Sequence, residues 1–537
     1  MLSKALLFIA VYLFSIIHAA DKSNWSNVTG TSSTTFPTDV GHLGDMAVGL
    51  APLTTQDDPL NSTEFVKGYG IDMRDKPMDG GASDDVYTNF GPYTPWRPAE
   101  NLFPETNAYR TMPSQCQLKQ VHILHRHGAR YPTDGMDDGP GLFGAMVRNA
   151  TRKGTFNATG ALSFLHHWNY SLGEAILFHQ GAQELFDSGV KHYYEYGRLL
   201  SNASAKPVIR TTSSSRVLDS SRYWTLGFFG WDATEKMNLE VLTEADGQNN
   251  TLEPKYACPN GKEFAFGDTM RKQWQKVYLK DALKRWQRDI QGLNLTIEDM
   301  FNIIQVCPFE TAGLGFSQFC SLFTKEEWEG FEYDGDLKFQ GNSGFMNPMA
   351  KPMGIGYVQE FLARLTNHSI TGQPTSQNMT LDRNETYFPL EQRLYADFTH
   401  DNAIVNILTA FNLTQLADQL QASEPSKNRR FRARDIVPFA ARIAIEVMEC
   451  QDKKKTMPYI RFKINDAVVP LDEGQGCEKR PDGLCLQSDF VKHLKNAIQA
   501  SQFDLACFGK NGTDFVVTSP VSNGQLTPAQ RGKSSTP

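Results

Sequence analysis

The chain has 537 residues, of which 40% are hydrophobic, enough to bury a large core in one extended domain or in several smaller ones. The formal net charge of −7 argues against a nucleic-acid partner, which would need a basic surface. A small anionic ligand remains compatible with this charge, because it needs only a local positive pocket.

The first twenty residues have the pattern of a secretory signal peptide. Lys4 precedes an apolar stretch from Ala5 to Ile17, and the small residues Ala19 and Ala20 suit cleavage. The stretch is too short to span a membrane comfortably, and the polar C-terminus lacks the apolar tail of a lipid-anchor signal. We therefore expect no membrane anchor and a protein that is secreted, either extracellular or associated with the cell wall.

Residues 21–105 are rich in Ser, Thr, Asp, Gly and Pro, which predicts a loosely structured N-terminal extension. Val121 and Ile123 then alternate with His122, which is typical of the end of a half-buried strand. The string Arg126-His127-Gly128-Ala129-Arg130-Tyr131-Pro132-Thr133 follows at once.

This string brings two guanidinium groups and an imidazole together in five residues. Arginine suits bidentate recognition of phosphate oxygens, and histidine can carry a phosphoryl group covalently. Gly128 allows the backbone to turn where a side chain would obstruct it. The alternative is a basic loop whose arginines pair with nearby carboxylates.

The middle of the chain alternates predicted helices with one strand. Helices are expected at 143–148 and 180–200, a buried strand at 207–211, and a helix at 217–229 that follows the loop carrying Arg216. In the second helix Leu185, Phe186, Val190, Tyr193 and Tyr194 lie at helical spacing and predict a core-facing side. Residues 255–355 are expected to be mainly helical, with a further helix at 354–366.

The last part of the chain contains a second candidate strand end. A strand at 394–399 ends at His400-Asp401, and a helix at 402–411 follows. Ligands of open α/β sheets bind at the carboxyl ends of strands. Pro438 is expected to open a helix that ends near Cys450. Strands within 459–471 and a helix at 489–498, capped by Ser488, complete a layered α/β pattern.

Fourteen Asn-x-Ser/Thr sequons fit secretion and predict N-linked glycans. They start at Asn24, Asn27, Asn61, Asn149, Asn157, Asn169, Asn202, Asn249, Asn294, Asn367, Asn378, Asn384, Asn412 and Asn511.

Eight cysteines in a secreted chain favour disulfides. The sequence contains no Cys-x-x-Cys pair, so the cysteine spacing argues against a zinc site. Close spacing favours Cys307–Cys320 and Cys477–Cys485. The remaining four, Cys116, Cys258, Cys450 and Cys507, allow three pairings.

The string at 126–133 resembles the signature of the histidine acid phosphatases. The resemblance implies that His127 is the nucleophile and that Arg126 and Arg130 bind phosphate. The stretch from Tyr395 to Asn402 resembles the family's second motif, which implies that His400 binds phosphate and Asp401 is the general acid. Ser213-Ser214-Ser215-Arg216-Val217 resembles the segment that supplies a third phosphate-binding arginine, here Arg216.

The resemblance to the fungal phytase branch extends over most of residues 90–510, including 91–96 and 322–328. It implies a phosphoglycerate-mutase-like layered α/β core with a smaller, discontinuous helical subdomain at roughly 135–175 and 255–355. It also implies a catalytic domain over 106–510, a disordered tail over 511–537, and the disulfides Cys116–Cys450 and Cys258–Cys507.

The expected function is that of an acid phosphomonoesterase with a phosphohistidine intermediate. No metal or cofactor is expected, because the arginines supply the positive charge. Small phosphate esters are the expected substrates, with phytate, an inositol hexakisphosphate, as the first choice. A broad-specificity acid phosphatase is the alternative, and a catalytically silent cell-surface glycoprotein is the alternative of another class.

One feature of the sequence weakens the choice of phytate. Asp134, Asp137 and Asp138 follow the first motif and would repel a polyanion. Arg148, Arg152, Lys153 and Lys338 are the cations that could offset these charges.

Overall fold

The computed structural model describes residues 86–133, 139–200, 205–452 and 455–527. The predicted signal peptide, the extension as far as residue 85, and Asp134, Asp137 and Asp138 lie outside this part of the chain. Residues 86–105, which were assigned to the extension, belong instead to the folded body. They form short 3-10 helices, and Phe90 and Phe103 are buried because both side chains pack into the main apolar core.

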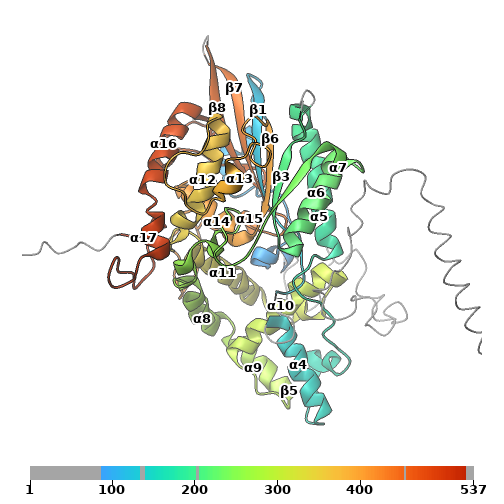
Figure 1. Cartoon of the computed structure of the whole chain (residues 1–537). Helices are drawn as coiled ribbons and strands as arrows, with labels where there is room; N and C mark the ends of the chain where they lie inside the picture. Colours follow the sequence, from blue (N-terminus) through green and yellow to red (C-terminus); the bar gives the residue numbers. More distant parts are fainter. Residues whose placement is uncertain (1–85, 134–138, 201–204, 453–454, 528–537) are drawn as a thin grey trace, which may run out of the picture.

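One mixed sheet forms the centre of the molecule (Figure 1). Its strand order is β10-β8-β7-β1-β6-β3-β4, with β9 paired to β8. Strands β1, β6, β3 and β4 are parallel to one another, whereas β7 pairs antiparallel with both β1 and β8, and β8 pairs antiparallel with β9 and β10. The bounds are β1 Cys116–Arg126, β3 Val208–Thr212, β4 Asn238–Leu242, β6 Leu394–Thr399, β7 Arg442–Asp452, β8 Lys455–Ile464, β9 Ala467–Val468 and β10 Cys485–Leu486.

Helices cover both faces of this sheet. Strand β1 alternates its side chains, so that Val121 and Ile123 enter one core and Leu124 enters the other. Helices α5 (His179–Tyr196) and α6 (Ser215–Phe229) pack together on the first face. The second face carries α12 (Ala350–Thr366), α14 (Asp401–Ala410) and α16 (Gln487–Ala500). The predicted layered α/β core is confirmed.

A helical region extends from one end of the sheet (Figure 1). It combines an early segment of the chain with a later one, and α4 packs against α10. Its main elements are α4 Gly139–Arg152, η5 Gly160–His166, α8 Phe266–Tyr278, α9 Lys280–Asp289, α10 Ile297–Leu314 and α11 Lys325–Asn342, with the small strands β2 Asn157–Ala158 and β5 Ile290–Gln291. The shorter elements of the chain are η2 Val86–Asn89, η3 Gly91–Tyr93, η4 Pro104–Tyr109, η6 Gly197–Leu200, α7 Ala233–Lys236, η7 Pro254–Tyr256, η8 Pro259–Lys262, η9 Gln318–Leu322, α13 Met379–Asp382, η10 Thr414–Leu416, α15 Ala433–Ile436, η11 Glu473–Gln475 and α17 Phe503–Phe508.

Two expectations about the end of the chain are wrong. The helix expected from Pro438 to Cys450 is strand β7, which pairs with both β1 and β8. Its β-branched residues Ile443, Ile445 and Val447 alternate along the strand and are buried, as a strand between two neighbours requires. Ser488 does not cap α16, because the helix begins at Gln487 and its N-cap residue is Leu486.

The expected core face of α5 is also wrong. Tyr193 and Tyr194 are 53% and 82% exposed, and Phe186 is exposed as well. The buried side carries small residues, including Gly181, Ser188 and Gly189, together with Leu185 and His192. Small residues lie on this side because neighbouring backbone comes very close, so that a Cβ on Gly189 would lie 2.1 Å from the carbonyl oxygen of Trp224.

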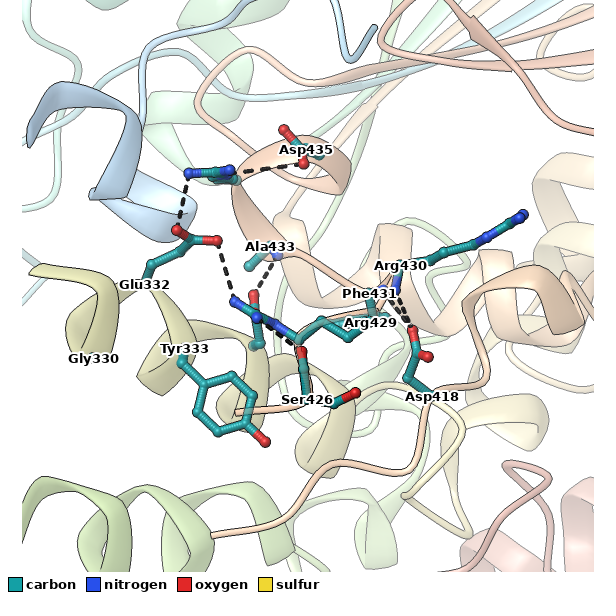
Figure 2. A network of polar contacts seen from close by, with 12 residues as sticks. Gly330, Glu332, Tyr333, Asp418, Ser426, Arg429, Arg430, Phe431, Ala433 and Asp435 are labelled. Carbon is teal, nitrogen blue, oxygen red and sulfur yellow. Dashed lines mark hydrogen bonds and ion pairs between the residues drawn. The ribbon is translucent and has the colours of Figure 1, made fainter. Parts of the chain in front are cut away.

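A network of ion pairs fastens the segment before β7 to helix α11 (Figure 2). Arg429 binds Asp336 at 2.7 Å and Glu332 at 3.3 Å, and Arg434 binds Glu332 at 2.9 Å. Asp418 accepts the backbone N–H groups of residues 430 and 431. The network therefore fixes α15, which leads directly to the carbonyl of Val437 beside the candidate site.

Four disulfides cross-link the described part of the chain: Cys116–Cys450, Cys258–Cys507, Cys307–Cys320 and Cys477–Cys485. These include the two long-range pairs that the family resemblance implied. Residues 511–527, assigned to a disordered tail, reach back onto the body, where Phe515 and Leu526 are buried. Within the described ranges, no helix has the length and apolar character needed to cross a membrane.

Candidate active site

The carboxyl ends of the four parallel strands supply the charged side chains of one site. His127 follows β1, Arg216 lies just after β3, Glu244 follows β4, and His400 follows β6. The register places Arg126 opposite Thr399, so the two motifs that are far apart in the sequence end side by side. This is the edge at which α/β sheets bind ligands.

The loop after β1 has a partner for each backbone polar group from the carbonyl of Arg126 to that of Ala129. The amides of His127, Gly128 and Ala129 donate to the Thr399 carbonyl, the Ser220 hydroxyl and the Glu184 carboxylate, respectively. The carbonyls of His127, Gly128 and Ala129 accept from the Ala440 amide, the His127 ring and the Phe178 amide, respectively. The Arg126 carbonyl accepts from the His125 ring. Complete pairing holds this loop in one conformation.

The ring of His127 is held in one tautomer. Its Nδ1 lies 2.8 Å from the carbonyl oxygen of Gly128, and a carbonyl can only accept, so Nδ1 carries the proton. The lone pair of Nε2 is then available for attack. Burial, reinforced by the charges of Arg126, Arg216 and Arg130, lowers the pKa of His127 well below its usual range and keeps the ring neutral.

Arg126 is fully buried and anchored at three points. Its Nη1 donates to the carbonyls of Pro92 and Val437 at 2.5 and 2.6 Å, and its Nη2 lies 2.5 Å from Oδ2 of Asp401. Burial would raise the pKa of Asp401, but the guanidiniums of Arg126 and Arg130 hold it well below the usual range. Asp401 is therefore ionised in this structure.

A second chain of contacts positions His400. Arg216 Nη2 lies 3.4 Å from His400 Nδ1, and His400 Nε2 lies 2.8 Å from Oε1 of Glu244. Burial would raise the pKa of Glu244, but the bond to His400 lowers it to about 2. Glu244 is thus an ionised partner that orients the imidazole of His400.

The six residues predicted for the site are close together. The ring centroids of His127 and His400 are 5.7 Å apart, and Arg126, Arg130 and Arg216 all lie near enough to His127 to shift its pKa. The sequence analysis missed Glu244, Glu184 and Ser220. Glu244 could have been found only if 238–242 had been identified as a parallel strand, because its place two residues after a strand end is the sole signal.

A cavity of about 610 Å³ reaches the site at Arg130, which is the one of the six predicted residues that lines it. Arg130 and Lys338, which line it, also act on the charge of Asp401. Its cationic lining is completed by Arg271, Lys272 and Lys276 of α8. Arg148, Arg152 and Lys153, proposed from the sequence as compensating cations, are exposed residues that do not line it.

The lining of this region has unsatisfied donors. Among the described residues, the buried Nε–H groups of Arg126, Arg130 and Arg216 have no hydrogen-bond acceptor. Buried polar groups are normally paired, so three such guanidinium donors around one imidazole favour a bound anion. In the part of the chain that the structure describes, no group of three or more His, Cys, Asp or Glu could hold a metal ion.

A neutral imidazole whose Nε2 does not carry the proton, surrounded by three arginines at the ends of parallel strands, can hold an anion next to a nucleophilic nitrogen in an α/β protein. The sequence model described as the histidine phosphatase superfamily, branch 2, matches residues 117–465. The chain belongs to this family, and the resemblance recognised from its two motifs is confirmed.

Curated relatives match most of the chain. Phytase A of Aspergillus oryzae is 33% identical over 424 residues, covering 75% of this chain and 87% of the relative. Phytase A of Aspergillus awamori is 34% identical over 426 residues, covering 76% and 88%, respectively.

Solved structures share the fold. The crystal structure of the phytase from D. castellii superposes with a TM-score of 0.63 at 24% identity and covers 88% of this chain and 94% of its own. A multiple inositol polyphosphate phosphatase of Bifidobacterium longum, solved in complex with inositol hexasulfate, gives a TM-score of 0.50 at 13% identity, covering 71% and 92%.

Proposed function

We propose that this protein is a phosphomonoesterase that acts through a phosphohistidine at His127, with phytate as its preferred substrate. The observation that carries the proposal is the free Nε2 of a neutral His127 among Arg126, Arg130, Arg216 and His400. These four groups bind the phosphate and stabilise the negative charge of its equatorial oxygens during transfer.

The reaction has two balanced steps. In the first, Nε2 of His127 forms a bond to phosphorus, the bond from phosphorus to the ester oxygen breaks, and Asp401 donates a proton to the leaving alcohol. In the second, water attacks phosphorus, the phosphorus–nitrogen bond breaks, and Asp401 takes the proton of the water. Inorganic phosphate leaves and both residues return to their starting states.

The charge of Asp401 must change when substrate binds. Without substrate its carboxylate is paired with Arg126, which favours the ionised form. A phosphate bound to Arg126 and Arg130 places negative charge beside Asp401, which raises its pKa toward the range in which it can donate a proton. The substrate thereby prepares its own general acid.

Phytate is favoured over a general phosphomonoester by the charge of the cavity. Lys272, Lys276 and Lys338 line it together with Arg271, whereas Asp268 and Glu298 are its acidic lining residues. The polyanionic ring needs contacts for phosphates other than the one that reacts, and these cations can supply them. The names of the curated relatives point the same way.

The choice between phytase and broad acid phosphatase is tested on α8. The double variant Lys272→Ala/Lys276→Ala should raise KM for phytate about 10-fold and leave KM for p-nitrophenyl phosphate within about 2-fold, because only the larger ester reaches α8. Lys280→Ala, an exposed lysine that does not line the cavity, is the matched control. Equal changes for both substrates would favour the broad phosphatase.

The enzyme class is tested at His127. His127→Ala should lower turnover of p-nitrophenyl phosphate near pH 5 by about 10⁴-fold or more and remove the phosphoenzyme that acid quenching traps in the wild-type protein. A wild-type protein that hydrolyses neither ester would instead support the silent-glycoprotein alternative.

We also propose that the protein is secreted and glycosylated. Four disulfides fit an oxidising compartment. Exposed sequon asparagines on the described surface are compatible with glycan attachment. They are Asn149, Asn157, Asn169, Asn249, Asn294, Asn367, Asn384 and Asn511.

A further inference from the structure

A buried chain of hydrogen bonds lies behind the site, on the face of the sheet covered by α5. Arg442 Nη1 lies 2.8 Å from Ser188 Oγ, which lies 2.8 Å from His125 Nε2. His125 Nδ1 lies 2.7 Å from the carbonyl oxygen of Arg126. All four residues are buried, and His125 has no exposed surface.

This hydrogen-bond chain begins at a group that can only donate and ends at a group that can only accept, and these two groups determine where each of its protons lies. The Arg126 carbonyl can only accept, so His125 Nδ1 carries the proton. Burial lowers the pKa of His125 to about 3, so the ring is neutral and Nε2 must accept the Ser188 hydroxyl proton. Arg442 can only donate, which leaves the serine oxygen as its acceptor. Hydrogen-bond donation therefore runs in one direction, from Arg442 through Ser188 and His125 to the carbonyl of Arg126.

That carbonyl belongs to the peptide bond that joins Arg126 to His127. At this peptide bond, the His127 amide donates to the carbonyl of Thr399 at 3.2 Å, and the Arg126 carbonyl accepts from the His125 ring. A rotation of this peptide plane would move both the phosphate-binding guanidinium and the attacking imidazole. Small displacements of reacting groups are costly, because attack requires close alignment.

We propose that His125, oriented by Ser188 and Arg442, is a positioning residue that fixes the peptide plane between Arg126 and His127 for in-line attack on phosphorus. This inference rests on the proposed function, since it assigns His125 a role in the step that His127 carries out. His125 touches no substrate atom and acts only through the Arg126 carbonyl.

Substituting His125 by asparagine or by glutamine tests the functions of its two ring nitrogens separately. In His125→Asn the side-chain amide replaces Nδ1, so it can still donate to the Arg126 carbonyl and loses only the contact with Ser188. In His125→Gln the amide replaces Nε2, so it keeps Ser188 and loses the carbonyl. His125→Phe retains the stacking on Phe398, whose ring centroid lies 5.5 Å away, and loses both contacts.

We expect the Gln and Phe variants to form the phosphoenzyme about 10- to 100-fold more slowly in rapid-quench measurements, with KM nearly unchanged. The Asn variant should lose no more than about 5-fold. Ser188→Ala removes the same contact as the Asn variant and leaves the His125 bond to the Arg126 carbonyl, so it should likewise lose no more than about 5-fold. Thermal unfolding of each variant is measured in parallel.

His122 provides the matched control. It lies on the same strand and is equally buried, but it faces the opposite side of the sheet, where it stacks on Tyr395. His122→Asn, His122→Gln and His122→Phe should change the unfolding temperature without separating the Asn variant from the Gln variant in rate.

Two outcomes would overturn the positioning role. Asn and Gln variants of His125 with equal rates would show that neither nitrogen matters, and rate losses that follow the unfolding temperature in both histidine series would indicate packing alone. Failure of the proposed function looks different, because the wild-type protein itself would then form no phosphoenzyme.

Discussion

One hydrogen bond decides which nitrogen of His127 is available for chemistry. The Gly128 carbonyl accepts a hydrogen bond from the protonated Nδ1, and burial together with the surrounding arginines keeps the ring from acquiring a second proton. Two of these arginines, Arg126 and Arg130, also keep Asp401 ionised in the absence of substrate. In the proposed mechanism, the charges of Arg126 and Arg130 therefore have two effects: they keep the nucleophile His127 neutral, and they keep Asp401 ionised until substrate binds.

Asp401→Asn tests this division of roles. The amide cannot donate a proton to an alkoxide, so hydrolysis of an alkyl phosphate should fall about 10²- to 10³-fold, while p-nitrophenyl phosphate, whose leaving group needs little protonation, should lose less. Steady-state kcat for the two esters in wild-type and variant enzyme gives the comparison. Equal losses for both would argue against Asp401 as the acid.

The residues that could be predicted are those with local signals. Arg126, His127 and Arg130 are contiguous, and His400-Asp401 ends a recognisable strand. Glu184, Ser220 and Glu244 contact the same site but come from three separate elements and carry no motif. Their role exists only after the chain has folded.

At the scale of elements, helix α5 supports the catalytic loop through its smallest residues. A Cβ on Gly181 would lie 2.0 Å from the carbonyl oxygen and 2.6 Å from the amide nitrogen of Ala129. Hydrophobic periodicity predicted the helix but selected the wrong face. Aromatic residues usually mark a core, whereas here close backbone packing requires glycine and serine.

Gly181→Ala should consequently affect both stability and rate. The added methyl group must displace the backbone of Ala129, which we expect to cost about 1–3 kcal/mol and to lower kcat at least 10-fold. Thermal unfolding and kcat for p-nitrophenyl phosphate measure the two effects. Gly173→Ala, whose Cβ would meet its nearest neighbour at an ordinary 3.4 Å, is the control and should change neither strongly.

Strand β7 shows a second limit of local patterns. Pro438 and an apolar stretch resemble the start of a helix, yet residues 442–452 lie between β1 and β8. The pairing that decides the outcome comes from β1, more than 300 residues earlier. The parallel strands β1, β3 and β6, and the helices that follow β3 and β6, were predicted because each has its own periodicity, whereas the parallel strand β4 was missed.

At the scale of the whole molecule, buried groups on many elements have shifted pKa values. Among the described residues, burial raises the pKa of six carboxyl groups: to about 7 for Glu184, Glu240, Glu310 and Glu332, to about 8 for Asp382, and above the usual range for Asp336. Burial also lowers the pKa of five described histidines, namely His122, His125, His127, His192 and His493. Both sets make folding stability depend on pH.

Whether folding stability rises or falls with pH depends on how many protons the folded and the unfolded chain bind. Between about pH 5 and 6.5 the unfolded chain gains protons on histidines while the folded chain retains them on carboxyls, so the two sets oppose each other. Above pH 6.5 the unfolded histidines are neutral too, and only the carboxyls differ. The folded state then binds more protons, so its stability falls as pH rises from 6.5 to 8.

We therefore expect the unfolding temperature to vary little between about pH 5 and 6.5 and to fall steadily toward pH 8. Calorimetry at constant ionic strength measures it. Glu240→Gln removes one of the contributing carboxyls, whose Oε1 has no hydrogen-bond partner among the described residues, and should reduce the slope above pH 6.5. An unfolding temperature that rises from pH 6.5 to 8 would contradict the argument.

The central position of β1 has a consequence for biosynthesis. Its neighbours in the sheet are β6 and β7, which begin about 270 and 315 residues after β1 ends. At about 5–20 residues per second, a ribosome needs roughly 15 to 60 seconds to deliver them. During that interval the apolar strand that leads to His127 has no sheet partner on either side, so the nascent chain must be protected from self-association until most of it has been made.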